Sequence, residues 1–434
     1  MNRRELMLSL AAGAASATSL HGMQNDRKQP QSQLPDARPR PAHDSPIRSG
    51  DAGDMRRIRD ARWTPERAFR YIEPYGPIKG CNYVNRNGGV INIHECQAKT
   101  SSICGDPMQG GSECCPLGTL DSRLIEKELA WARDTVGLNS MRIWAPCYVY
   151  QADREKFFDQ FERFLQVAAR NGISVMPVTD VLSVRDPDLD PNLPAEETLN
   201  FVPGVHGGGW HKQGRIGWSA QWDRMKPIIK EYLQSFLSRY ANDKRIVLWD
   251  LCNEAPINAR ALVEWLFTWV REVNPSQPLS VCWQGHDLSD IITFHTYSRP
   301  GYPSENSPGG DFTTELEWAA QWGRPMLCTE CLARPFENTP QTFLPFFGRY
   351  RIGWYVWGLA AGGPAQYQYP WGWPMGSPSP DRWFHYLLYP DGRPYSAEEI
   401  LMIRDFKYMR PAEMGGTQSF WRNENGEIVD TPPK

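Results

Sequence analysis

Trp249-Asp250-Leu251-Cys252-Asn253-Glu254 and Pro325-Met326-Leu327-Cys328-Thr329-Glu330 are two apolar runs that each end in a glutamate. An apolar run of this length, bounded by polar residues, is typical of a strand in a parallel sheet, which is buried on both faces. Parallel barrels keep their chemistry at the carboxyl ends of their strands. The two stretches therefore predict two barrel strands, each presenting one carboxylate at the same end of the fold.

From about Pro77 onward, short apolar runs of this kind alternate with longer amphipathic segments. Eight runs are predicted as strands: 77–84, 138–146, 172–181, 245–252, 278–284, 290–297, 324–330 and 352–359. Helices are predicted between them at 121–136, 154–170, 221–240, 259–273 and 313–322. This alternation predicts an α/β fold, a (β/α)8 TIM barrel with extended aromatic-rich loops at its C-terminal face. A doubly wound open sheet is the alternative, but residues 80–89 lack its glycine-rich phosphate-binding fingerprint.

The chain has 434 residues and a formal net charge of −3. This charge argues against a nucleic-acid partner held by bulk electrostatics and against a polybasic membrane surface. Beyond the N-terminus, no apolar run approaches the roughly 20 residues that span a bilayer. We therefore expect neither partner and no membrane span in the mature chain, while the oligomeric state stays unknown.

The N-terminus carries Arg3-Arg4, a modest apolar run and the small residues Ala15-Ser16-Ala17. This layout is typical of a bacterial export signal of the twin-arginine kind, so we expect a periplasmic or secreted protein. An ordinary disordered N-terminus is the alternative. The expected organisation is an export signal at 1–23, a disordered linker at 24–60, the barrel at 61–412 and a C-terminal tail at 413–434.

Ten cysteines are compatible with export. Four of them fall in the Gly/Ser-rich loop 95–117, where one or two disulfides of undetermined pairing are expected; the rival, a structural zinc site, lacks a matching spacing. Cys328 and Cys331 form a C-x-x-C pair, which is a redox motif in some proteins. Because Glu330 lies between them at a strand end, we predict buried packing residues instead.

Several strand ends carry side chains that suit work on a glycosidic bond. Glu254 and Glu330 supply the two carboxylates that such chemistry requires, about 5–5.5 Å apart in a retaining enzyme. Candidate substrate-binding residues at the remaining strand ends are Arg142, Asn253, His295, Tyr297 and Trp357. No metal or cofactor is expected.

Each of these residues also has a structural interpretation. Glu254 could be a helix N-terminal acid, and Glu330 could form a surface ion pair with Arg334. Arg142 could serve only a structural salt bridge, His295 and Tyr297 could make core hydrogen bonds, and Trp357 could be a core residue.

Two loops add aromatic candidates for sugar binding. Residues 366–385 hold six aromatic side chains, Trp371 among them, and residues 202–218 hold Trp210 amid glycines. Exposed rings of this kind pack against the C–H faces of sugars. The second interpretation of the loop at 366–385 is a small satellite core that covers the end of the barrel. His206 and His211 in the second loop give only weak grounds for a metal site.

Together these residues resemble the clan A glycoside hydrolases, and family 5 in particular, over roughly residues 77–359. The resemblance rests on Arg142 at the second strand end, Asn253-Glu254 at the fourth, His295-x-Tyr297 at the sixth, Glu330 at the seventh and Trp357 at the eighth. It implies Glu254 as acid/base and Glu330 as nucleophile, with the remaining residues in support. One departure is that Ala255 stands before Pro256, where the family commonly has Pro directly after Asn-Glu.

We therefore expect a retaining hydrolase of β-linked glycosides in a polysaccharide or oligosaccharide. A carbohydrate-binding protein that has lost catalysis on the same scaffold is the second hypothesis. A redox or metal centre built from the cysteines is the third.

Overall fold

The computed structural model describes residues 55–84, 122–184, 222–255, 259–299, 321–361, 368–369, 380–409, 421–422 and 428–429. The chain forms two units, residues 1–34 and 35–434, and every described residue belongs to the second. The expected export signal and most of the expected linker lie outside the described residues, and the last part of that linker forms helix α2 (Met55–Asp60). No helix within the described ranges is long and apolar enough to cross a membrane.

Eight parallel strands form the barrel, in the order β5-β4-β3-β2-β1-β8-β7-β6. Seven of the eight runs predicted from the sequence contain one of them, and the run 324–330 ends one residue before β7 does, so the predicted (β/α)8 barrel is confirmed. Seven of the eight neighbouring pairs form strand ladders, and only β5 and β6, at the two ends of this order, do not pair with each other. The barrel is therefore nearly closed. The strands are β1 (Lys79–Asn82), β2 (Ser140–Pro146), β3 (Ser174–Asp180), β4 (Trp249–Asp250), β5 (Leu279–Ser280), β6 (Ile292–His295), β7 (Met326–Cys331) and β8 (Gly353–Trp357).

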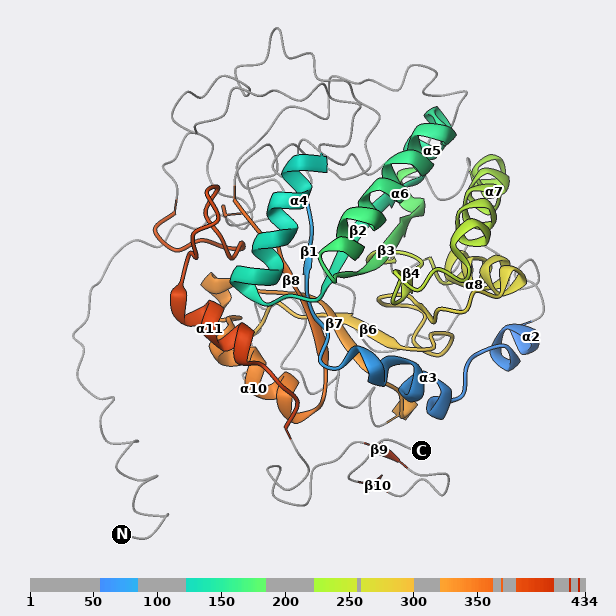
Figure 1. The fold of residues 1–434 in the computed structure, drawn as a ribbon. Helices are drawn as coiled ribbons and strands as arrows, with labels where there is room; N and C mark the ends of the chain where they lie inside the picture. Colours follow the sequence, from blue (N-terminus) through green and yellow to red (C-terminus); the bar gives the residue numbers. More distant parts are fainter. Residues whose placement is uncertain are drawn as a thin grey trace, which may run out of the picture. The chain divides into compact units, whose positions relative to one another are not determined.

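Helices surround these strands (Figure 1). Those that connect or follow them are α4 (Ser122–Trp131), α5 (Cys147–Ala152), α6 (Arg154–Arg170), α7 (Trp222–Tyr240), α8 (Arg260–Val273), α10 (Pro340–Arg349) and α11 (Ala397–Asp405). The predicted helix at 313–322 lies almost wholly outside the described residues. Near the C-terminus, β9 (Trp421–Arg422) and β10 (Ile428–Val429) pair antiparallel.

Helix α6 shows how the sequence sets these elements. The Asp153 side chain accepts the N–H of Lys156 and so caps the first turn. Phe157, Phe161 and Phe164 recur at helical spacing and are fully buried. Gly172 follows the helix at φ +66°, a left-handed conformation that glycine adopts without strain. The predicted range of this helix is confirmed.

The connection between β5 and β6 departs from the barrel pattern, since residues 281–291 contain no helix. The segment ahead of helix α3 (Pro65–Ile72) packs there instead. Arg62 donates to the carbonyls of His286 and Ser289, at 2.8 and 2.7 Å. The N-terminal segment therefore covers the place where a connecting helix is expected.

Asp290 lies between β5 and β6, which do not pair with each other, and its side chain bonds to three neighbouring segments. Its carboxylate accepts the backbone N–H groups of Trp63 and Leu279, at 2.8 and 2.9 Å. It also accepts two hydrogen bonds from Arg271 on α8, at 2.9 and 2.7 Å. The side chain is fully buried. One carboxylate thus joins β5, α8 and the N-terminal segment.

The barrel interior below the site is filled by large side chains. Tyr355 on β8 lies fully buried, and its hydroxyl bonds Ser140 on β2 at 2.8 Å. A Cβ at Gly80 would clash with the Tyr355 ring. Glycine on β1 is therefore required for this ring to occupy the barrel.

Candidate active site

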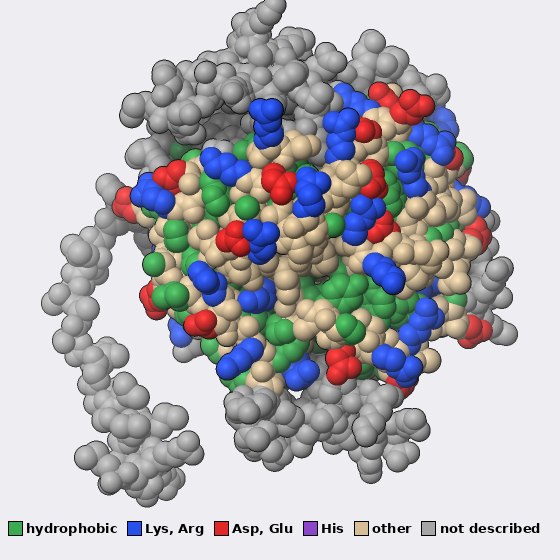
Figure 2. Space-filling view, in the orientation of Figure 1, with side chains coloured by type: hydrophobic (Ala, Val, Ile, Leu, Met, Phe, Trp, Pro, Cys, Tyr) green, Lys and Arg blue, Asp and Glu red, His purple; other side chains and the backbone are tan. Residues whose placement is uncertain are grey.

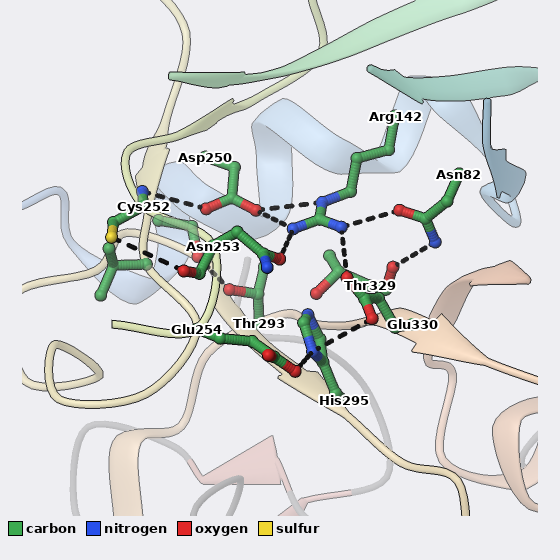
Figure 3. Close-up of polar contacts among 12 residues, drawn as sticks. Asn82, Arg142, Asp250, Cys252, Asn253, Glu254, Thr293, His295, Thr329 and Glu330 are labelled. Carbon is green, nitrogen blue, oxygen red and sulfur yellow. Dashed lines mark hydrogen bonds and ion pairs between the residues drawn. The ribbon is translucent and has the colours of Figure 1, made fainter. Parts of the chain in front are cut away.

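The structure brings most of the predicted site residues to the carboxyl ends of the strands (Figure 3). Arg142 lies on β2 and Glu330 on β7, whereas Asn253 and Glu254 follow β4. His295 is the last residue of β6, Tyr297 comes two residues later, and Trp357 ends β8. Trp210 and Trp371 lie outside the described residues. Five distant segments of the chain thus converge on one end of the barrel.

Arg142 is the centre of the hydrogen-bond network and has no exposed surface. Its guanidinium donates to Asp250 at 3.0 and 2.8 Å and to Glu330 at 2.9 Å. It also donates to the side-chain oxygens of Asn82 and Asn253, at 2.7 and 2.6 Å. Burial alone lowers the pKa of Arg142, but Asp250 and Glu330 outweigh burial and leave that pKa raised. The group is therefore a permanent cation that faces Glu330.

Asp250 is the fixed counter-charge of Arg142. It is fully buried, and burial raises the pKa of its carboxyl, while Arg142 acts in the opposite direction. A buried ion pair gains little net free energy, yet removing one partner leaves an uncompensated charge that costs about 3–5 kcal/mol. Asp250 therefore holds the guanidinium in place without occupying the side that faces Glu330.

Glu330 receives donors on both carboxylate oxygens. Oε1 accepts from Arg142, and Oε2 accepts from the Tyr297 hydroxyl at 2.5 Å. Burial and the neighbouring charge of Glu330 raise the pKa of Tyr297 well above its usual value, so the phenol keeps its proton and donates. Only 7% of the Glu330 side chain is exposed. A guanidinium and a phenol together suit a carboxylate that is ionised, because that form only accepts.

Glu254 has a more open environment. Its side chain is 39% exposed, and Oε1 lies 2.9 Å from Nδ1 of His295. The residue has φ +46°, an uncommon conformation for a non-glycine residue and one that clusters at functional sites. Helix α8 begins only at Arg260, so Glu254 does not act as an acid at the N-terminus of that helix.

His295 lies between the two carboxylates. Nδ1 is 2.9 Å from Glu254 and 3.5 Å from Glu330. An ionised carboxylate has no proton to give, so Nδ1 carries the hydrogen when both acids are charged. Nε2 is buried and has no hydrogen-bond partner among the described residues. The ring therefore orients the two acids. The ring of Trp283 packs beside it, with the two ring centroids 5.9 Å apart.

The separation of the two acids is the most informative dimension of the site. A ligand atom from each of Glu254, His295 and Glu330 lies within 4.8 Å of the two remaining ones. Such a triad is able to hold a metal ion in principle. However, Arg142 places a positive charge against Glu330, and the oxygen atoms of Glu330 already accept hydrogen bonds from Arg142 and Tyr297. A hydrogen-bonded acid pair beside a buried cation fits proton and group transfer better than cation binding.

Trp357 contributes to an aromatic cluster near the strand ends. Its ring lies 5.1 Å from that of Trp144, and both residues are 6% exposed. Arg142 also stacks over Trp144, at 4.8 Å. In the described part of the aromatic loop, Phe384 is fully buried and Trp383 stacks on Tyr395. Phe384 therefore fits the interpretation as a satellite core, whereas Trp383 is only partly buried.

The contacts of Arg334 and of the C-x-x-C cysteines settle the roles of these residues. Arg334 does not pair with Glu330, because it is buried and bound to Glu399 at 2.6 Å. Cys328 and Cys331 are both fully buried free thiols, as predicted for packing residues. The four cysteines of loop 95–117 lie outside the described residues.

Sequence reasoning did not single out Asn82 and Asp250. Asn82 ends β1, is fully buried and bonds Arg142. Asp250 stands inside the apolar run that ends at Glu254, and a charge within a buried strand requires a buried partner. The negative charge of Asp250 could therefore have indicated a buried cationic partner, which the structure shows to be Arg142.

No model of a known protein family matches the sequence, and no curated protein matches it significantly. Solved structures do match. A family 5 mannosidase from Rhizomucor miehei is 14% identical with a TM-score of 0.46, over 78% of this chain and 93% of the mannosidase. An endo-β-1,4-mannanase from Thermotoga petrophila is 14% identical with a TM-score of 0.45, over 80% of this chain and 79% of the mannanase. GH5_18 from Streptomyces cattleya, in complex with GlcNAc, is 13% identical with a TM-score of 0.44, over 65% of this chain and 74% of GH5_18.

These solved structures are similar to the chain and include family 5 glycoside hydrolases. At these identities and TM-scores the likeness carries no argument, so the case for a function rests on the side chains of the site.

Proposed function

We propose that this protein is a retaining glycoside hydrolase that cleaves β-linked bonds in an oligosaccharide or polysaccharide. The observation that carries the proposal is the separation of Glu254 and Glu330, whose oxygens approach within 4.8 Å. Retaining enzymes place their carboxyl groups about 5–5.5 Å apart, whereas inverting enzymes need about 6.5–9.5 Å to admit a water. The nearest oxygens of the pair thus lie closer than the gap that an inverting enzyme needs for water, which favours direct attack on the sugar.

The surroundings of the two acids support different roles. Glu330 is buried, faces Arg142 and accepts from Tyr297, which suits a charged nucleophile. Glu254 is the more exposed acid and contacts a histidine, which suits an acid that exchanges protons with a leaving group and with water. The proposed mechanism follows from this division.

In the first step Glu330 attacks the anomeric carbon, and the bond to the leaving oxygen breaks as Glu254 gives that oxygen its proton. The product is an ester between the sugar and Glu330. In the second step Glu254, now a carboxylate, takes a proton from water, whose oxygen attacks the same carbon and releases Glu330. Two inversions give net retention, and Glu254 ends protonated as it began.

The first test is a panel of β-glucan, β-mannan and xylan with product analysis. We expect cleavage of at least one polymer, with retained configuration of the newly formed end by NMR. Binding to a glycan without cleavage across the panel would instead favour the non-catalytic carbohydrate-binding hypothesis.

The second test separates the two acids. Glu330→Gln should abolish turnover with the fold intact, because the amide keeps the shape of the carboxylate and Arg142 keeps Asp250 as its counter-charge. Glu254→Ala should lower kcat by about 10²–10⁴ on substrates with poor leaving groups, and azide should restore part of the rate by replacing water. Near-normal turnover by Glu330→Gln on every substrate of the parent would refute the assignment, and a lack of azide rescue would count against Glu254.

A further inference from the structure

Strand β7 is irregular at the candidate nucleophile. On one side, β6 pairs Phe294 with Cys328 and then His295 with Glu330. On the opposite side, β8 pairs Trp354 with Cys328, and its next partner is Cys331 paired with Val356. Thr329 is therefore passed over by both neighbours. A bulge of this kind re-aims the next side chain, and bulges are over-represented beside active sites.

The bulge leaves the backbone carbonyl of Thr329 in need of a donor, because buried carbonyl groups are almost always hydrogen-bonded. Asn82 supplies it, since its side-chain Nδ2 donates to Thr329 O at 2.8 Å and to Val356 O at 3.3 Å. Asn82 reaches this carbonyl from β1, which pairs with β8 and not with β7. The contact thus crosses one strand of the barrel (Figure 3).

The oxygen of the same amide holds Arg142. Oδ1 of Asn82 accepts from Nη1 of Arg142 at 2.7 Å, and this Nη1 also donates to Glu330 at 2.9 Å. The orientation of the amide follows from its partners, because a guanidinium only donates and a carbonyl only accepts. One fully buried side chain therefore contacts both the backbone beside Glu330 and the cation that faces Glu330.

We propose that Asn82 is a positioning residue for Glu330: its amide fixes the Thr329 bulge and the Arg142 guanidinium together, and so sets where the carboxylate points. The inference rests on the proposed hydrolase function. It goes beyond that function because it assigns the geometry of the nucleophile to a residue on another strand that touches neither the reacting atoms nor the carboxylate.

Asn82→Asp tests the proposal. The new carboxylate keeps an acceptor for Arg142 but opposes the Thr329 carbonyl with an oxygen, so the bulge loses its donor. Asn82→Ser is the second variant, which removes the amide without adding charge. A misplacement of about 1 Å at a reacting group lowers rates by about 10²-fold. We expect kcat to fall by about 10- to 100-fold in both variants, with a smaller change in KM.

Asn139 provides the matched control. It directly precedes β2 and bonds to β1 at the amino ends of these strands, where its amide oxygen accepts from the N–H of Lys79 at 2.8 Å and its Nδ2 donates to Pro77 O at 3.0 Å. Asn139→Asp removes an amide donor to a backbone carbonyl far from the site, at a partly buried position. We expect it to lower the unfolding temperature, with kcat unchanged.

The leaving group distinguishes positioning of the nucleophile from general disorder of the site. Rates are measured on dinitrophenyl and phenyl β-glycosides of cellobiose, mannobiose and xylobiose. Only the phenyl leaving group needs a proton from Glu254. If Asn82 acts through Glu330, both substrates lose the same factor in the Asn82 variants, whereas Glu254→Ala loses far more on the phenyl glycosides.

The proposal is overturned if a folded Asn82 variant keeps the parental rate, or if its loss is confined to the phenyl glycosides. It is also overturned if neither variant folds while Asn139→Asp does, since Asn82 would then be a folding residue. A parent that cleaves no glycoside refutes the proposed function instead. In that case crystal structures of the parent and of Asn82→Asp decide the geometric part: displacement of the Glu330 carboxylate by about 1 Å supports the proposal, and an unmoved carboxylate overturns it.

Discussion

At the scale of single residues, the site depends on side chains that serve the fold and the proposed chemistry at once. Arg142 neutralises Asp250 and also faces Glu330, so its loss would unbalance two buried acids. Variants of such a residue lose stability and activity together and say little about mechanism. Tyr297 is more informative, because its hydroxyl can be removed while its ring stays in place.

Tyr297→Phe removes the hydrogen bond to Glu330 and preserves the packing of the ring. We expect kcat to fall by about 10- to 100-fold, since one stabilising donor at a charged group is worth about 1.5–3 kcal/mol. Tyr232→Phe is the matched control, because the buried Tyr232 hydroxyl donates to the carbonyl of Ala145 away from the two acids. It should lower the free energy of unfolding by about 1 kcal/mol in urea titrations and leave kcat unchanged. Equal kcat values for the two variants would remove Tyr297 from the proposed mechanism.

The strand-end residues of the site were predictable, because a barrel places the carboxyl ends of all its strands at one mouth. Placing Glu254, His295 and Glu330 at strand ends was therefore enough to place them together. Asn82 was not predictable, since its role depends on the Thr329 bulge. A bulge is a mismatch between the registers of two neighbouring strands, and neither register can be obtained from one strand alone.

At the scale of elements, apolar runs located all eight strands but overestimated several of them. The run 245–252 contains a strand of only two residues, Trp249–Asp250. Burial determines the apolar run, whereas the strand ladder depends on which partner groups lie within hydrogen-bonding distance. Burial also explains why β5 and β6 are connected without a helix. Residues 281–291 are largely buried because the N-terminal segment covers them.

Asp290 should be the most sensitive position of this connection. Asp290→Asn keeps the shape of the side chain but removes the charge that Arg271 needs and replaces one acceptor by a donor. We expect the free energy of unfolding to fall by about 3–5 kcal/mol, because the change leaves a largely buried cation unpaired. The measurement is a denaturant titration followed by tryptophan fluorescence and circular dichroism.

Asp134→Asn is the control for that measurement, because Asp134 forms an ion pair with Arg133 in which both side chains are exposed. We expect little change in stability from it, since exposed pairs are screened by water and salt. Equal effects of the two substitutions would show that Asp290 does not hold β5, α8 and the N-terminal segment together.

At the scale of the whole molecule, exposed charges contribute little to stability. Figure 2 shows Lys and Arg side chains mixed with Asp and Glu over the described part of one face, in keeping with a formal net charge of only −3. Pairs such as Arg163 with Asp159 are about half exposed. The dependence of stability on pH should therefore come from buried groups, which keep one protonation state in the folded chain.

His286, a partly buried residue in the connection between β5 and β6, is expected to contribute in this way. Burial lowers its pKa from 6.5 to about 4, although the Thr293 carbonyl at 3.0 Å and Asp287 act in the opposite direction. In the unfolded chain the ring takes up a proton near its usual pKa, so the unfolded state binds more protons than the native state between about pH 6.5 and 4. The contribution of His286 to stability is therefore complete above about pH 6.5 and is lost as the pH falls toward 4.

His286→Gln tests this sign. The glutamine amide can donate to the Thr293 carbonyl as Nε2–H does, but it does not titrate. At pH 8 the parent and the variant should unfold with similar free energies. As the pH falls to 4 the parent should lose up to about 3 kcal/mol more than the variant, because each pKa unit corresponds to about 1.4 kcal/mol. Urea titrations at intervals between pH 8 and pH 4 measure this difference directly. A difference that stays constant over that range would show that His286 keeps an ordinary pKa in the folded protein, and that the connection between β5 and β6 is open to water.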